Sequence, residues 1–309
     1  MPKRTLTLIP IPAPGAQDVL LSANGTAYTG TADGSIWAVK PGAGQARRVA
    51  NTGGRPLGLE WLPDGRLLVC DARKGLLAVT STGQVETLAD AVDGVRMRLC
   101  NNAAVLRDGS IYFTDASTKW SLDQWQSDLV EDTCTGRLLR LVPGGTPQVL
   151  LGGLSFATGV AKAADESFVT VAETGHRRIR RYYLSGPDAG NADVFVEDLP
   201  AHPNNSSLGT DGLIWTTATS PAAPTLALLQ KAPAVLRAAA RRAPVALKRV
   251  PKRTARVAAY DDKGRLVHDV DCDPTQWHLA TGVREHNGRV WLASMREPAL
   301  AFVDLRLRR

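Results

Sequence analysis

The stretch Asp108-Gly109-Ser110-Ile111-Tyr112 joins a turn dipeptide to a short apolar segment that contains an aromatic residue, and this phrase recurs along the chain. Asn-Gly and Asp-Gly pairs suit tight turns because glycine adopts positive φ without steric penalty. Five further copies begin at Asn24, Asp64, Asp165, Asp211 and Asn287. The six copies are spaced by 40, 44, 57, 46 and 76 residues, a pattern that indicates a repeat architecture.

The residues after each turn run apolar or alternate with polar residues, which is typical of strands. Further strand-like segments follow in most copies, for example Gly136–Leu141 and Ala192–Val196. Four antiparallel strands per copy make a propeller blade. We therefore expect an all-β, six-bladed β-propeller that forms a single domain over residues 1–309. The segment Thr5–Pro10 is expected to add the outer strand of the last blade and so to close the ring.

Two copies carry insertions after the second strand, at about 117–135 and 221–254. The second strand of a blade returns to the face where the innermost strands begin, so both insertions should overhang that mouth of the channel. We interpret 221–254 as short amphipathic helices that form a lid. A loop with solvated charges is the alternative, and contact with a membrane surface is less favoured.

The positive charge of the chain is concentrated in one segment. Nine cations and no acid lie between Lys231 and Arg256, and subtracting them from the net charge of +7 leaves −2 for the rest. This distribution argues against a nucleic-acid partner. No apolar run approaches the ~18 residues that span a bilayer, and the first fifteen residues do not resemble a signal peptide, so we expect a cytoplasmic protein. The cysteines lack Cys-x-x-Cys spacing, so free buried thiols are expected at Cys70, Cys100, Cys134 and Cys272.

The repeat aligns equivalent positions of the six blades. Counting back eight residues from each turn glycine, or from Glu166 in the fourth copy, gives the expected starts of the innermost strands. We call these the ring positions, and they are Gln17, Leu57, Asn101, Thr158, Asn204 and Ala280. Four of these side chains carry oxygen, which suits a hard cation or a polar ligand in the central channel. Side chains that simply meet channel water are the alternative interpretation.

Asn101–Val105 followed by Asp108–Asp115 resembles the strictosidine synthase-like branch of the SMP-30/gluconolactonase/paraoxonase superfamily. Leu154–Val160, Val171–Tyr182 and Glu197–Pro200 are similar to the same branch. The resemblance implies a six-bladed propeller with calcium or another divalent ion in the channel. It also implies lactonase, arylesterase or phosphotriesterase activity or, in one plant branch, a Pictet–Spengler condensation.

On this resemblance, the metal ligands are Gln17, Asn101, Thr158 and Asn204. Hydrolytic members of the superfamily have Glu, Asn and Asp where this chain has Gln17, Thr158 and Asn204. The chain thus keeps oxygen ligands but lacks both usual carboxylates, and only an inward-turned Asp18 would supply a negative charge. Because calcium affinity rises with the charge of the ligands, calcium binding is expected to be weak or lost.

Candidates for proton transfer are His202 and His278, each two residues before a ring position, together with Asp18. Arg96 and Arg98 are candidates for binding an anionic group of a substrate. The plant condensing enzymes have a catalytic Glu where this chain has Thr281, four residues before Glu285. We assign Thr281 to substrate binding, and its presence disfavours strictosidine formation itself.

Three carboxylates at the ends of second strands, Asp71, Asp115 and Glu173, are expected near the mouth, where they accept hydrogen bonds from the amides of loops.

The leading functional hypothesis is a small-molecule hydrolase of the lactonase or esterase type, in which a divalent ion polarises a carbonyl for attack by water. A metal-independent synthase or cyclase acting on a biosynthetic intermediate is the second hypothesis. A propeller that binds a small molecule or a partner without catalysis is the third. The chain has no Gly-x-Ser-x-Gly, His-Glu-x-x-His or phosphate-loop motif, which argues against other common enzyme classes.

Overall fold

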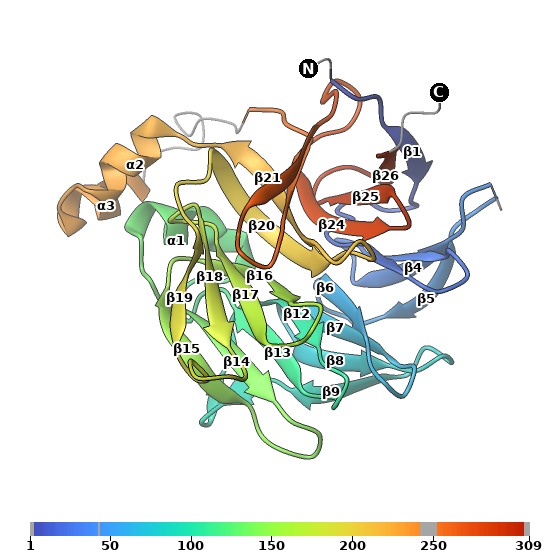
Figure 1. Cartoon of the computed structure of the whole chain (residues 1–309), viewed down its shortest axis with the longest axis horizontal. Helices are drawn as coiled ribbons and strands as arrows, with labels where there is room; N and C mark the ends of the chain where they lie inside the picture. The colour runs from blue at the N-terminus through green and yellow to red at the C-terminus, as the bar shows by residue number, and fades with distance from the viewer. Residues whose placement is uncertain (1–2, 43, 242–251, 306–309) are drawn as a thin grey trace.

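A computed structural model of the chain contains six four-stranded antiparallel sheets arranged around a centre, and it describes residues 3–42, 44–241 and 252–305 (Figure 1). This arrangement is the predicted six-bladed β-propeller. Each of the first five blades takes four consecutive strands from the chain. The strands are, in order, β2 (Leu20–Leu21), β3 (Ala27–Gly30), β4 (Ser35–Val39) and β5 (Arg47–Asn51) in blade 1; β6 (Pro56–Trp61), β7 (Leu67–Asp71), β8 (Gly75–Val79) and β9 (Val85–Ala89) in blade 2; β12 (Cys100–Val105), β13 (Ile111–Asp115), β14 (Gly136–Leu141) and β15 (Gln148–Leu154) in blade 3; β16 (Ala157–Lys162), β17 (Phe168–Glu173), β18 (Arg178–Tyr183) and β19 (Ala192–Val196) in blade 4; β20 (Ala201–Leu208), β21 (Ile214–Pro221), β22 (Arg256–Tyr260) and β23 (Leu266–Asp271) in blade 5.

Blade 6 combines the two ends of the chain. Its strands β24 (Ala280–His286), β25 (Arg289–Ser294) and β26 (Ala299–Asp304) are joined by β1 (Thr7–Pro10) from the N-terminal region. β1 pairs antiparallel with β26, so the predicted closure of the ring is confirmed. The contact covers the outer edge of β26 and fastens the N-terminal segment to the last blade.

Apolar side chains fill the spaces between neighbouring blades. Strands β7 and β8 are buried along their whole length because each of their faces packs against another sheet. Between blades 2 and 3, for example, Leu68, Cys70 and Leu76 pack in one cluster with Phe113 and Leu139. The core is therefore a series of wedges between blades, and the channel is lined by the innermost strands β2, β6, β12, β16, β20 and β24.

Both predicted insertions contain helices, and these helices meet at one edge of the ring, at the upper left of Figure 1. They are the 3₁₀ turn η1 (Leu122–Gln124) and α1 (Trp125–Glu131) in the first insertion, and α2 (Pro224–Gln230) and α3 (Ala234–Arg241) in the second. Gln230 Nε2 donates a hydrogen bond to the Leu129 carbonyl at 2.9 Å, which joins α2 to α1. Leu226 of α2 packs against a buried apolar cluster that includes Leu129 and Leu57. Leu57 is the ring position of blade 2. The helices thus pack together at the edge of the ring, and α2 contacts the cluster that contains Leu57.

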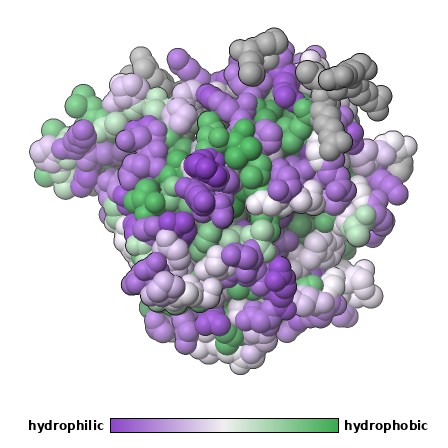
Figure 2. Space-filling view, in the orientation of Figure 1, coloured by the Kyte–Doolittle hydropathy of each residue, from purple (hydrophilic) through white to green (hydrophobic). Residues whose placement is uncertain are grey.

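Part of the lid predicted over 221–254 lies outside the described residues, namely 242–251. Figure 2 shows apolar surface on the projecting helices among hydrophilic residues. The large exposed apolar side chains of α2 and α3 are Leu228, Val235 and Leu236.

Among the described residues, no helix is long and apolar enough to cross a membrane. A short hairpin, β10 (Ala91–Val92) with β11 (Val95–Arg96), precedes blade 3.

Candidate functional site

A break in strand pairing lies at or near the start of the innermost strand in five blades. The pairing skips between Pro56 and Gly58, Cys100 and Ala103, Ala157 and Val160, Pro203 and Ser206, and Ala280 and Gly282. Such a bulge bends the strand and releases one or two residues from the ladder. In blades 2 to 5 the first released residue is the ring position predicted from the repeat: Leu57, Asn101, Thr158 and Asn204. In blade 1, Gln17 precedes the short strand β2.

The sixth ring position is Thr281, so the predicted Ala280 is wrong by one residue. Ala280 begins β24 and pairs with Ser294, while the bulge releases Thr281. The eight-residue count fails here because only two residues separate β24 from β25, whereas five separate β12 from β13. The Thr281 hydroxyl donates to the Gln17 carbonyl at 2.9 Å, so it already has a partner within the protein.

Three ring side chains bury an amide oxygen that has no hydrogen-bond partner. These atoms are Gln17 Oε1, Asn101 Oδ1 and Asn204 Oδ1. A buried polar atom without a partner costs free energy, and in a native protein it points to a bound ion, water or ligand. Equivalent positions of the blades are related by rotation about the channel axis, so the three oxygens belong to one level of the channel. The fourth predicted ligand differs, because the Thr158 hydroxyl is hydrogen-bonded to Thr174 Oγ1 at 2.8 Å.

A second layer lies one residue further along each innermost strand and alternates polar side chains with glycine. Its members are Asp18, Gly58, Asn102, Gly159, Asn205 and Gly282. The glycines leave room for the neighbouring polar groups. A Cβ at Gly282 would lie 2.7 Å from Asp18 Oδ1, and a Cβ at Gly58 would lie 2.9 Å from Asn102 Nδ2.

Asp18 and Asn102 tie this second layer together across the blades. Asp18 Oδ2 accepts hydrogen bonds from the Leu59 amide at 3.0 Å and from Asn102 Nδ2 at 3.4 Å. Asn102 Oδ1 accepts from the Val160 amide at 2.7 Å. These bonds link Asp18 and Asn102 beside the ring positions, and Asp18 is the carboxylate of the layer.

Burial raises the pKa of Asp18 to about 6, although the positive charge of Arg284 and the hydrogen bond from Leu59 act in the opposite direction. The positive charge of Arg284 is shared between Asp18 and Glu60, because the guanidinium also donates a hydrogen bond to Glu60 Oε2 at 3.1 Å. A carboxyl group that titrates near neutral pH can hold or release a proton under working conditions, which is typical of functional sites.

His202 lies on β20 two residues before Asn204 and is buried. Its Nδ1 is 2.8 Å from the Thr174 carbonyl oxygen. A carbonyl only accepts hydrogen bonds, so Nδ1 carries the proton and the neutral ring keeps its lone pair on Nε2. Burial lowers the pKa of His202, which keeps the imidazole neutral near pH 7. The Thr174 hydroxyl is also hydrogen-bonded to the hydroxyl of Thr158, so Thr174 links His202 to one of the ring positions.

The other candidates lie in different surroundings. His278 is paired with Glu297. Arg96 and Arg98 are exposed, and the Arg96 guanidinium donates to the Arg73 carbonyl at 3.3 Å. Within the described part of the chain, no hydrogen bond or ion pair joins either arginine to a ring residue. Their assignment to substrate binding stays a prediction.

The three strand-end carboxylates are structural, as expected. All are fully buried, and each accepts a backbone hydrogen bond of 2.9 Å from the loop before an innermost strand. The pairs are Asp71 with Arg55, Asp115 with Leu99, and Glu173 with Ser155. These caps fix the loops that carry the ring residues.

The donor set at the ring fits a hard divalent cation. Its three unpartnered atoms are carbonyl-type oxygens, which calcium and magnesium prefer, and there is no soft sulfur ligand among the ring positions. The nearest carboxylate in sequence is Asp18, which belongs to the second layer. Because these ligands are neutral, we expect the affinity of the ring for the cation to be modest.

Comparison with known proteins supports the same architecture. A family model described as strictosidine synthase matches residues 101–187. The adipocyte plasma membrane-associated protein of Rattus norvegicus is 34% identical over 306 residues, covering 90% of this chain and 80% of that protein. Protein STRICTOSIDINE SYNTHASE-LIKE 6 of Arabidopsis thaliana is 33% identical over 292 residues, covering 87% and 74%.

Solved structures with low sequence identity share the fold. A gluconolactonase from Xanthomonas campestris superposes with a TM-score of 0.71 at 16% identity, covering 97% of this chain and 89% of that one. The calcium-binding protein regucalcin of Agrobacterium tumefaciens gives a TM-score of 0.66 at 14% identity, covering 96% and 90%. With sequence relatives above 30% identity along nearly its whole length, the chain belongs to the strictosidine synthase-like family of six-bladed propellers.

Proposed function

We propose that this protein hydrolyses a lactone or a carboxylic ester at the mouth of its channel, with a divalent ion held at the ring. The observation that carries the proposal is the set of three buried, unpartnered amide oxygens on Gln17, Asn101 and Asn204. The fold shared with a gluconolactonase and with a calcium-binding protein supports the proposal without fixing the substrate.

The three amide oxygens would hold the ion, and Asp18 would supply the adjacent negative charge. When bound, a divalent ion at this level supplies a Lewis acid that polarises a substrate carbonyl. The bulges aim the ligands, and the hydrogen bonds of Asp18 and Asn102 in the second layer keep the strand starts from rearranging.

His202 is the candidate general base. Its neutral ring accepts a proton at Nε2 from the attacking water as the water oxygen bonds to the carbonyl carbon. The Thr174 carbonyl holds the Nδ1 proton and stabilises the imidazolium that forms. The carbon–oxygen bond of the lactone or ester then breaks, and the proton passes from Nε2 to the leaving alkoxide. Hydrolysis consumes water and needs no other reactant.

The metal part of the proposal is tested by calcium titration of chelator-treated protein, followed by thermal unfolding. A ligand that binds only the folded state stabilises it by RT ln(1 + [L]/Kd), so calcium should raise the Tm. Asn101→Ala should abolish the rise, whereas Asn191→Ala, which changes an exposed asparagine, should leave it unchanged. No Tm rise at millimolar calcium, or an equal rise in both variants, would contradict the assignment.

The catalytic part is tested with a panel of lactones and aryl esters, assayed with and without calcium. His202→Gln should lower kcat by about 100-fold or more while the calcium-induced Tm rise persists. Calcium binding without any turnover would favour a non-catalytic binding propeller. Turnover that survives complete metal removal would favour metal-independent chemistry instead.

A further inference from the structure

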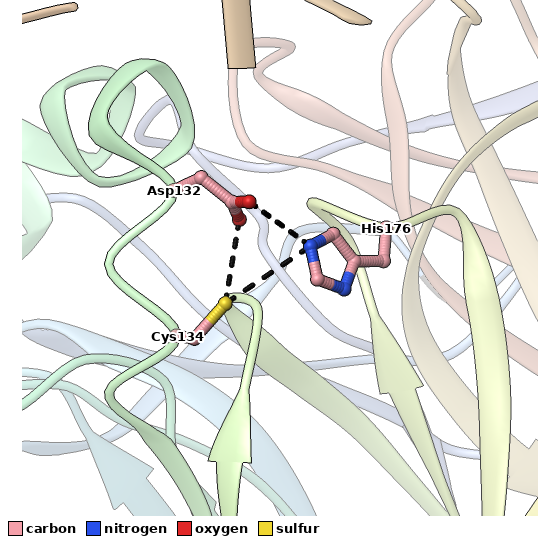
Figure 3. A group of neighbouring side chains, drawn as sticks. All are labelled: Asp132, Cys134 and His176. Atoms are coloured by element: carbon pink, nitrogen blue, oxygen red, sulfur yellow. Dashed lines mark hydrogen bonds and ion pairs between the residues drawn. The ribbon is translucent and has the colours of Figure 1, made fainter. Parts of the chain in front are cut away.

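A second group of potential metal ligands lies away from the ring, between blades 3 and 4. Asp132 and Cys134 belong to the insertion that follows β13, and His176 belongs to the turn between β17 and β18. Their side chains point toward one another (Figure 3). One ligand atom from each residue lies within 4.8 Å of the other two. The group brings together a carboxylate, a thiol and an imidazole.

The three separations, in which Asp132 contributes a different oxygen to each of its two contacts, are close to those between the ligands of a tetrahedral metal ion. His176 Nε2 lies 3.1 Å from Asp132 Oδ2 and 4.0 Å from Cys134 Sγ, while Cys134 Sγ lies 3.5 Å from Asp132 Oδ1. A tetrahedral zinc ion with ordinary Zn–S, Zn–N and Zn–O bonds separates its ligand atoms by about 3.4 to 3.6 Å. Only small side-chain movements are needed to close the three residues around such an ion.

Neighbouring groups orient these side chains as outer partners orient metal ligands. Glu173 Oε2 lies 3.7 Å from His176 Nδ1, on the side of the ring away from the thiol. Ser155 Oγ donates to Asp132 Oδ1 at 2.7 Å, and the Ser155 amide donates to Glu173 Oε2 at 2.9 Å. A carboxylate behind the second nitrogen of a ligating histidine is a recurrent feature of zinc sites.

The backbone is held in a costly conformation at both ligands of the insertion. Asp132, the residue directly after α1, has φ of 49°, and Cys134 has φ of 48°. Residues other than glycine rarely adopt this left-handed region, and such strain concentrates at functional sites. Here it turns both side chains toward His176.

We propose that Asp132, Cys134 and His176 bind a transition-metal cation of the zinc type, with solvent in the fourth position. Zinc accepts sulfur and nitrogen together with oxygen, whereas calcium and magnesium prefer oxygen alone. On binding, the Cys134 S–H bond breaks, a metal–sulfur bond forms, and the proton passes to solvent. The ion cross-links the insertion that carries α1 to blade 4 at the mouth of the channel.

The rival explanation is a nucleophilic cysteine served by His176 and Asp132. The Asp132 carboxylate lies 3.5 Å from Cys134 Sγ and 3.1 Å from His176 Nε2, and Glu173 Oε2 lies 3.7 Å from His176 Nδ1. Two carboxylates beside the thiol and the imidazole disfavour a free thiolate and favour a bound cation.

The test uses the full chain, treated with a chelator and then titrated with Co²⁺, which reports on its own ligands. One equivalent of Co²⁺ should produce a thiolate-to-cobalt charge-transfer band and the visible bands of tetrahedral cobalt, and Zn²⁺ should abolish both. Zn²⁺ should also raise the Tm. Cys134→Ser should remove the charge-transfer band, and His176→Ala should weaken metal binding at least 10-fold.

Matched controls separate this site from the ring. His286→Ala changes a histidine of the β24–β25 hairpin and should leave the cobalt spectrum unchanged. Asn101→Ala should also leave it unchanged, so the zinc site stands or falls independently of the proposed hydrolase site. Absence of cobalt bands at millimolar metal would overturn the proposal, and so would a charge-transfer band that survives in Cys134→Ser. Apo Cys134→Ser should unfold at the temperature of the apo wild type, and a spectrum lost in this folded variant supports the assignment.

Discussion

Replacing Asp18 by Asn should stabilise the metal-free protein at neutral pH, because folding removes an ionised carboxylate from water. Burial raises the pKa of Asp18 from 3.8 to about 6. One pKa unit corresponds to 1.36 kcal/mol, so a rise of about two units amounts to about 3 kcal/mol. An asparagine amide has the same shape and can still accept the hydrogen bond of the Leu59 amide.

The sign follows from which state holds the proton. Between pH 3.8 and about 6, the folded protein keeps a proton on Asp18 that the unfolded chain releases. The contribution of this group to stability therefore falls as pH rises through that window, and the full loss is present above it. The advantage of Asp18→Asn should be about 3 kcal/mol at pH 7.5 and should shrink steadily toward pH 4.

Denaturant unfolding in the presence of a chelator, at pH 4.5 and pH 7.5, measures this difference in the free energy of unfolding. Asp188→Asn is the control, because Asp188 is exposed and its variant should follow the wild type at both pH values. A variant of Asp18 that is less stable than the wild type at pH 7.5 would refute the reasoning. An advantage of the same size at both pH values would refute it as well, because burial of charge would then not be the cause.

Three further predictions concern the walls of the channel. Gly159→Ala should destabilise the fold by about 3 kcal/mol, because its Cβ would lie 2.3 Å from the Asn204 carbonyl oxygen, whereas Gly152→Ala meets open space and should change stability little in thermal unfolding. Asp71→Ala should lower the free energy of unfolding in denaturant by about 3 kcal/mol or more, because three backbone amides lose their buried acceptor. The control Asp123→Ala breaks only an exposed ion pair with Arg73 and should lower it by less than about 1 kcal/mol. If His202 is the base, activity should rise with pH to a plateau, with a midpoint below the ordinary value of 6.5 because burial lowers its pKa; a midpoint above 6.5 would exclude this residue.

The blades could be predicted from the sequence because their signals are local. A turn pair such as Asp108-Gly109 and the apolar run after it act over fewer than ten residues, and repetition made six weak signals into one strong one. The same alignment of the repeats located Asn101, Thr158 and Asn204 at the bulges of their innermost strands. It missed by one residue in blade 6, where a tighter hairpin shortens the count to Thr281.

The channel needed the tertiary structure, because adjacent residues of a regular strand face opposite ways. Only the bulges turn both Asn101 and Asn102 out of the ladder, so the second layer around Asp18 left no periodic trace in the sequence beyond its alternating glycines. The raised pKa of Asp18 likewise depends on burial, which a strand pattern does not reveal.

The sequence by itself determined the six blades, the closing strand and the family, since turn chemistry, strand patterning and motif order are all written along the chain. The three-dimensional arrangement decided which groups meet. Asp132, Cys134 and His176 come together only because blades 3 and 4 are neighbours and two left-handed residues redirect the insertion. Contacts across 40 or more residues depend on how whole sheets pack, and no local pattern of residues encodes that distance.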